Sequence, residues 1–330
     1  MKENKITAIP TGIKSFKSLK NLELSKNNLG TLPNVFAKLP TLAYIGLSYN
    51  PQLDFSTSFN YLSQLKTLNK VDISNNKLKE IPQEVMDVRY VTWLDISFNE
   101  ITQIPDRMTQ LIRMRYLNAE NNAITSISEA FPLLERLEVL KFDNNKISTL
   151  PTTIGDIADL KVLDLHNNGI TALPEGMRKL KSLENLDLSH NLFEKFTFNI
   201  GNLSALKHLD LNDTHLKEIN AEHLGKLTNL DYLDLSGNVG LNWDVIEPAI
   251  GKLPALETLK ITHVELKSIE PHLSDAPQLK DLDLSSNKDL IESEGFWKAI
   301  ASFKMLTKLN LSENEATFLP DDFRLCKKLI

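Results

Sequence analysis

Residues 183–193 read LENLDLSHNLF, and the spacing of apolar residues and asparagine in this stretch decides the fold. With Leu183 as position one, apolar residues stand at positions one, four, six and eleven, and Asn191 stands at position nine. Positions four and six share one side-chain parity, as a β-strand with one buried face requires. The asparagine comes just after this strand, where the chain must turn. Its amide can there bind backbone groups that the turn leaves without partners.

The same pattern returns along the whole chain. Most steps between copies are 23 residues, with exceptions of 26, 24, 26 and 27. Thr214 and Val264 replace the asparagine in two copies. The first positions of thirteen complete copies are Leu19, Leu42, Leu68, Val91, Met114, Leu137, Leu160, Leu183, Leu206, Leu230, Leu256, Leu279 and Leu306. Such repetition predicts stacked units that bury their apolar faces against their neighbours.

The second half of most copies contains an apolar residue followed by proline, as in Leu173-Pro174. Because proline cannot donate a backbone hydrogen bond, we expect extended chain or short 3₁₀ turns there rather than long helices. The prolines at this place are Pro10, Pro33, Pro82, Pro105, Pro151, Pro174 and Pro320.

Three longer segments, 54–68, 243–253 and 294–306, place apolar residues at the spacing of one helix face. We expect α-helical turns in them, with large aromatic side chains filling the core. A docking site on the outer face is the alternative.

The chain resembles leucine-rich repeat proteins over its entire length, mainly in the 23-residue form LxxLxLxxNxLxxLPxxhxxLxx, where h is apolar. The resemblance implies an α/β repeat solenoid. It would be a curved horseshoe with a parallel β-sheet on the concave face and short 3₁₀, helical or extended segments on the convex face. It implies no chemistry.

No Pro-, Gly- or Ser-rich linker interrupts the repeats, so we expect a single domain over residues 1–330. Asn4 and Ile6 fit the end of a repeat whose strand would precede residue 1, and Leu329 would begin a fourteenth strand. Solenoids generally need polar capping units, and neither end looks like one. We therefore expect a fragment of a longer protein. The alternative is a complete chain that self-associates through its uncapped ends.

Composition limits the partners. The chain has 37 Lys and Arg against 43 Asp and Glu, a net charge of −6, and no basic block, which argues against nucleic acid. No apolar run approaches the ~18–20 residues of a spanning helix, so we expect no membrane insertion. Met1 to Lys5 leads into no signal-peptide stretch. The compartment stays open, with the cytoplasm and a bacterial cell surface both compatible.

Catalytic signatures are missing from the sequence. It has no G-x-G-x-x-G, Walker, H-E-x-x-H or G-x-S-x-G motif, so we expect neither an enzyme nor a cofactor. The single cysteine, Cys326, falls at a core position. His166, His190, His208 and His215 lie in three consecutive repeats, but no two have the spacing of paired metal ligands on one element. We expect surface histidines and no metal site.

Position five is acidic in eight of thirteen copies, including four in a row: Asp164, Asp187, Asp210 and Asp234. On strands ~4.8 Å apart, these carboxylates would repel by about 1 kcal/mol in water and more near an apolar surface. Hydrogen bonds, cations or a basic partner would relieve the repulsion. Three interpretations stay open: an ordinary feature of the repeat, a surface for a basic protein or peptide, and calcium binding.

Aromatic residues gather in a few early repeats. Position three holds Tyr44, Trp93 and Tyr116, and position eight holds Tyr49 and Phe98. We expect them to cluster on part of the concave face and its rim, because exposed aromatics are enriched in binding hot spots. The alternative is that the rings shield the strands or pack on each other.

These features favour a non-catalytic interaction module that binds another protein or peptide on its concave face. In this hypothesis the aromatic residues anchor the partner and the acidic residues orient it. Two alternatives remain: a bacterial cell-surface or receptor-type ectodomain that binds glycan or a small ligand, and a regulatory arm of a larger multidomain protein.

Overall fold

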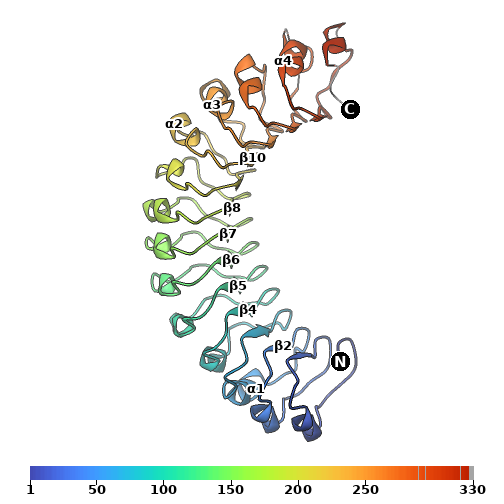
Figure 1. Ribbon diagram of the computed structural model, residues 1–330, viewed down its shortest axis with the longest axis vertical. Helices are drawn as coiled ribbons and strands as arrows, with labels where there is room; N and C mark the ends of the chain where they lie inside the picture. Colours follow the sequence, from blue (N-terminus) through green and yellow to red (C-terminus); the bar gives the residue numbers. More distant parts are fainter. Residues whose placement is uncertain (289, 294, 320, 327–330) are drawn as a thin grey trace. The chain divides into compact units, whose positions relative to one another are not determined.

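The computed structural model describes residues 1–288, 290–293, 295–319 and 321–326 (Figure 1). The chain divides into two compact units, residues 1–162 and 163–330, which are described separately. One domain over residues 1–330 stays a prediction. Pro320 and Leu329, which entered the sequence analysis, lie outside the described residues.

Each repeat contributes one short strand to a parallel sheet. In the first unit, each strand pairs with the next in the chain, residue for residue. The strands of this unit are β1 (Asn21–Glu23), β2 (Tyr44–Gly46), β3 (Lys70–Asp72), β4 (Trp93–Asp95), β5 (Tyr116–Asn118) and β6 (Val139–Lys141). β7 (Val162–Asp164) begins at the last residue of this unit.

The second unit repeats the arrangement, again with consecutive strands paired in parallel. Its strands are β8 (Asn185–Asp187), β9 (His208–Asp210), β10 (Tyr232–Asp234), β11 (Thr258–Lys260), β12 (Asp281–Asp283) and β13 (Lys308–Asn310). In Figure 1 the strands line one side of each unit and the helices and 3₁₀ turns line the other. The predicted solenoid with a parallel sheet is confirmed.

The core lies between these two sides and follows the predicted parity. Leu186 and Leu188, at positions four and six, are fully buried, as are their counterparts in most other repeats. Position seven has the strand parity of positions three and five, which predicts an outward-facing side chain there. Six of its serines, Ser189 among them, are 2–8% exposed, because a small side chain there is covered by the side chains around it, whereas Ser285 is half-buried and Ser312 is exposed.

The buried asparagine at position nine binds the turn in two directions. Asn191 Nδ2 donates to the carbonyl oxygens of Leu188 and Ser189 in its own repeat and of Leu165 in the preceding one. Its Oδ1 accepts the backbone N–H of Ile170, also in the preceding repeat. Equivalent bonds recur in the other repeats that carry asparagine here, which confirms the predicted ladder.

Position eight, just before that asparagine, has a left-handed backbone in every described repeat. Its φ is between 50° and 58° at the non-glycine residues and 74° at Gly237. With this conformation the position-eight N–H donates to the position-seven carbonyl of the next repeat, as His190 does to Asn212 at 2.8 Å. The chain therefore turns sharply at the end of the strand while the position-eight N–H keeps a hydrogen-bond partner in the next repeat.

The return path consists mostly of extended chain and 3₁₀ turns, as the prolines predict. Pro10, Pro33, Pro82, Pro105 and Pro174 directly precede such turns. The turns are Thr11–Ser15, Asn34–Lys38, Gln83–Asp87, Asp106–Gln110, Phe131–Leu133, Ile154–Asp156, Glu175–Lys179, Ile200–Asn202, Pro271–Asp275 and Asp321–Leu325.

The longer segments form the predicted helices: α1 (Phe55–Leu62), α3 (Trp243–Ile250) and α4 (Phe296–Ser302). The apolar residues of α1 and α4 are buried, so they fill the core as expected. A further helix, α2 (Ala221–Leu224), was not predicted; Asn220 caps it by accepting the N–H of His223. Among the described residues, no helix has the length and apolar character needed to span a membrane.

Replacing Asn191 with threonine tests how much the asparagine ladder stabilises the fold. The neighbouring repeat already has threonine, and Thr214 donates only to Leu211 O and Asn238 Oδ1. A hydroxyl cannot make the four bonds of Asn191, so we expect Asn191→Thr to lower the free energy of unfolding by about 1–3 kcal/mol. Chemical denaturation measures this. The exposed Asn185→Thr control should change it by less than about 0.5 kcal/mol, and equal losses would contradict the ladder's role.

Candidate interaction surfaces

The exposed face of the sheet, formed by positions three, five and eight, is partly committed to the fold. Asp187 Oδ1 accepts the backbone N–H of Ser189 at 2.9 Å and also the Ser189 hydroxyl. This bond satisfies a backbone donor at the end of the strand. The position-five aspartates that bind the N–H two residues later in the same way are Asp72, Asp95, Asp164, Asp210, Asp234 and Asp283. One oxygen of each carboxylate therefore serves the repeat itself.

Lys260 shows what happens when position five cannot accept a hydrogen bond. The N–H of Thr262, two residues later, donates to Ser236 Oγ of the preceding repeat at 3.1 Å. The backbone donor is satisfied either way. The Lys260 side chain is thereby left to interact elsewhere.

The four consecutive acidic residues differ in exposure. Asp164, Asp187 and Asp210 are half-buried, whereas Asp234 is only 3% exposed. Tyr232 donates its hydroxyl to Asp234 Oδ2 at 3.2 Å, and Lys260 Nζ lies 3.7 Å from the same oxygen. Asp234 is thus covered and neutralised by side chains of its own chain.

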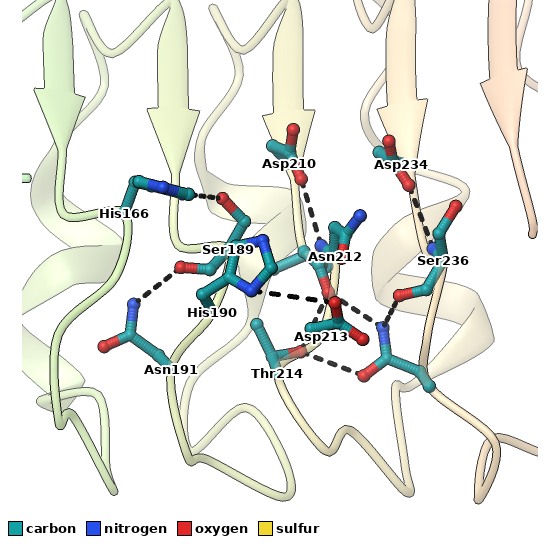
Figure 2. Close-up of polar contacts among 12 residues, drawn as sticks. His166, Ser189, His190, Asn191, Asp210, Asn212, Asp213, Thr214, Asp234 and Ser236 are labelled. Carbon is teal, nitrogen blue, oxygen red and sulfur yellow. Dashed lines mark hydrogen bonds and ion pairs between the residues drawn. The ribbon is translucent and has the colours of Figure 1, made fainter. Parts of the chain in front are cut away.

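Asp210 lies next to Asp234 in the sheet register and has a different environment (Figure 2). Burial raises the pKa of its carboxyl to about 7. The N–H of Asn212 opposes this rise in pKa, while the charges of Asp234 and Asp187 add to it. At neutral pH, the ionised Asp210 carboxylate is therefore held at a cost in free energy.

An aromatic pair lies beside these carboxylates. The rings of His208 on β9 and Tyr232 on β10 stack with their centroids 3.9 Å apart and their planes at 10°. Burial lowers the pKa of His208, although nearby aspartates oppose this. Neither residue is among the site residues that the sequence predicts. Their shared position three in consecutive repeats was the signal that could have found them.

Two further histidines lie at the strand ends of the same unit (Figure 2). The rings of His166 and His190 meet edge to face at 5.0 Å. His166 Nδ1 is 2.8 Å from Ser189 Oγ, and His190 Nδ1 is 3.6 Å from Asp213 Oδ2. Both histidines thus interact with neighbouring polar side chains.

The residue types that could bind a metal or act as a nucleophile are arranged as follows. Among the residues that the structure describes, no three His, Cys, Asp or Glu side chains are placed to hold one metal ion. Cys326 is half-buried rather than a full core residue. Burial raises the pKa of its thiol, which disfavours the reactive thiolate.

In the first unit, the structure brings two of the predicted aromatic residues together. Trp93 on β4 and Tyr116 on β5 are paired in register, and their rings stack at 5.2 Å with planes at 14°. Both rings are half-buried. Tyr44 is separated from them, because Lys70 on β3 occupies the register position between Tyr44 and Trp93.

Tyr44 instead belongs to a small polar network. Its hydroxyl donates to Glu23 Oε2 at 2.8 Å, and Glu23 Oε1 accepts the N–H of Ser25 at 3.0 Å. Gly46 leaves room for this network, since a Cβ there would lie 2.4 Å from Glu23 Oε1. Burial, with the Glu23 bond, raises the pKa of Tyr44, so its hydroxyl stays a donor.

Tyr49 and Phe98 lie at the rim, where position eight is left-handed. Their φ angles are 54° and 52°, and each side chain is 48% exposed. A bulky residue in this conformation costs about 1–2 kcal/mol, and an exposed ring adds an unfavourable hydration term. Asn75 occupies the same position in the repeat between them. The fold does not need an aromatic residue at this place.

The raised pKa of Asp210 makes a prediction about stability. The pKa of Asp210 rises from 3.8 to about 7 on folding, so the native state holds the proton more tightly than the unfolded state does. The free energy of unfolding therefore decreases as the pH rises from about 4 to about 7. Asp210→Asn keeps the acceptor for Asn212 and removes the charge.

At pH 8 this variant should therefore be more stable than the wild type by about 1–4 kcal/mol, and the difference should vanish towards pH 4. Chemical denaturation over this pH range measures it. Glu247, whose pKa burial also raises to about 7, is common to both proteins. A difference independent of pH would contradict the assignment.

Comparison with known proteins agrees with this geometry. The sequence matches the leucine-rich repeat region family over residues 106–218 and the leucine rich repeat family over residues 2–51 and 66–124. A comparison with curated protein sequences gives no significant match.

Solved structures from two bacteria and a plant share the fold. A leucine-rich repeat protein of Leptospira interrogans is 25% identical, with a TM-score of 0.68 over 99% of this chain and 92% of that one. An internalin of Listeria monocytogenes is 26% identical, with a TM-score of 0.64 over 78% of this chain and 71% of that one. The plant peptide hormone receptor RGFR1, in complex with RGF2, is 21% identical, with a TM-score of 0.68 over 99% of this chain and 65% of that one. The last shows likeness of fold alone.

Repeat period, asparagine ladder, parallel sheet and these matches all agree. Leucine-rich repeat domains are generally protein-interaction modules and are typically non-catalytic. The chain belongs to the leucine-rich repeat proteins.

Proposed function

We propose that this chain is a non-catalytic recognition module that binds another protein or peptide on the exposed face of its sheet. The observation that carries the proposal is the placement of Tyr49 and Phe98. Both are large aromatic residues, about half exposed, in a left-handed conformation that disfavours them. The left-handed conformation is common to position eight in every described repeat, so the fold requires the turn and not an aromatic side chain. A large exposed ring that the fold does not require is typical of a residue kept for binding.

The stacked rings of Trp93 and Tyr116 support the same role. They lie on β4 and β5, and Phe98 follows β4 in the same repeat as Trp93. Half-buried aromatic residues on rigid strands lose little conformational freedom when a partner covers them. They are the residue types that most often dominate binding energy at interfaces. These residues would form the apolar anchor.

The acidic residues of the second unit support a partner that is basic. One carboxylate oxygen of Asp187 and of Asp210 binds the backbone, as described above. The rest of each carboxylate lies on the half-buried exposed face. Positive charge on the partner would complement these residues and orient the bound molecule.

Loss of the stacked pair tests the proposal. We expect the Trp93→Ala/Tyr116→Ala double variant to lose a protein partner that the wild-type chain captures from a lysate of its source. Truncation of two central aromatic residues should weaken binding at least about tenfold. Affinity capture with identification by mass spectrometry measures this, with circular dichroism to show that the variant is folded.

Phe16→Ala is the matched control, because Phe16 is 55% exposed and ends the first 3₁₀ turn, away from the sheet. This control should retain the partner. If the double variant binds as well as the wild type, or the control loses the partner equally, the exposed sheet face of the first unit is not the anchor. Capture of glycans and no protein would favour the ectodomain alternative.

A further inference from the structure

The stacked rings of His208 and Tyr232 have a cation on one side. Lys260 Nζ lies 5.2 Å from the centroid of the Tyr232 ring and 3.7 Å from Asp234 Oδ2. An aromatic face and a carboxylate together hold this ammonium group. The arrangement uses the side of the stack that faces β11, because Tyr232 on β10 is paired with Thr258 on β11.

On the other side, the stack faces β8 with an equivalent set of groups. His208 is in register with Asn185, and Asp210 is in register with Asp187. We propose that the His208 ring, Asp187 and Asp210 form a site for an arginine side chain of the bound partner. This inference rests on the proposed function, since it names the group that the partner would present to the sheet of the second unit.

The carboxylates have the capacity to hold such a group. The hydrogen bonds to Asp187 and Asp210 within the described chain all fall on Oδ1. No lysine or arginine of the described residues forms an ion pair with either carboxylate; Lys260 is paired with Asp234, and its charge acts on Asp210 only from beyond ion-pair distance, where it lowers the pKa of that carboxyl. A guanidinium group between the two strands, which are ~4.8 Å apart, can donate to both carboxylates.

The ring of His208 suits a cation at neutral pH. Burial lowers its pKa, so the imidazole is uncharged and does not repel a positive group. Asn185, its in-register neighbour on β8, is an exposed, uncharged residue. A ligand cation would also stabilise the ionised form of Asp210, whose pKa burial raises to about 7, so binding should strengthen from pH 6 to pH 8.

The geometry favours arginine over lysine. A guanidinium group is planar, so it can stack on the imidazole while its N–H groups donate to two carboxylates. An ammonium group on a flexible chain can do one or the other. Lys260 illustrates the weaker arrangement, since its Nζ remains 3.7 Å from Asp234.

The test uses the full 330-residue chain and three small probes: Nα-acetyl-arginine amide, its lysine counterpart, and the neutral analogue Nα-acetyl-citrulline amide. The readout is the NMR signal of the His208 Cε1 proton, assigned with a His208→Asn variant. We expect a saturable shift with the arginine probe, a dissociation constant several-fold higher for the lysine probe, and no saturable shift with citrulline.

Asp187→Asn/Asp210→Asn should raise the dissociation constant at least about tenfold, because both charges are lost and the backbone acceptors are kept. Asp283→Asn is the matched control: Asp283 has the same position and the same bonds to a following serine on β12. It should leave binding unchanged.

Three results would overturn the inference: no saturable shift in the wild type, equal binding of arginine and citrulline, or unchanged binding in the double variant. Equal affinity for lysine would overturn the assignment to arginine. None of these results bears on the aromatic anchor of the first unit, so the proposed function is judged separately by the Trp93→Ala/Tyr116→Ala capture.

Discussion

The buried asparagine after each strand is the contact on which the structure depends. In one side chain it satisfies two carbonyl oxygens of its own turn and one carbonyl and one N–H of the preceding repeat, as Asn191 does. Buried backbone groups at a turn are costly to leave unpaired, by about 1–3 kcal/mol each. Because the amide joins neighbouring repeats, it also keeps the strands in register. The backbone of the sheet face is therefore held in place by buried asparagines and does not depend on the residues at its surface.

Because of this constraint, some surface side chains bind the backbone of their own repeat, and others are left to contact a partner. Wherever position five is an aspartate, one of its carboxylate oxygens accepts the N–H of position seven, so that oxygen is already used by the fold. Positions three and eight carry no such duty. The aromatic features that support binding lie there: the Trp93–Tyr116 stack, the His208–Tyr232 stack, and the rim residues Tyr49 and Phe98.

Most of the fold could be predicted from the sequence because one local pattern repeats. The strand parity, the turn asparagine, the 3₁₀ turns after proline and the helices α1, α3 and α4 follow from short-range spacing. Helix α2 was missed because its four residues give no periodic signal, and its cap, Asn220, is a side chain that is equally common in turns. The burial of position-seven serines such as Ser189 does not follow from strand parity, because parity gives the direction of a side chain and not how its neighbours cover it.

The candidate surfaces were predicted only in part. Which side chains of neighbouring repeats contact each other depends on their length and on which of them compete for the same partner. The predicted aromatic residues share positions three and eight, yet Tyr44 is separated from Trp93 by Lys70 and binds Glu23 instead. Asp234 occupies the same position in its repeat as Asp210 does, but Tyr232 and Lys260 cover it. Within the described chain Asp210 has no such contacts, and burial raises the pKa of its carboxyl. Such differences arise from contacts across strands 23 to 26 residues apart.

The most direct test of the central claim, that a protein partner binds the exposed sheet face, is hydroxyl-radical footprinting of the free and partner-bound chain. The account predicts reduced oxidation of Trp93, Tyr116 and Phe98 in the complex. It predicts unchanged oxidation of Phe16 and Leu133, which are 55% and 62% exposed in 3₁₀ segments away from the sheet. Protection of Phe16 and Leu133, with the three aromatic residues unchanged, would contradict the account.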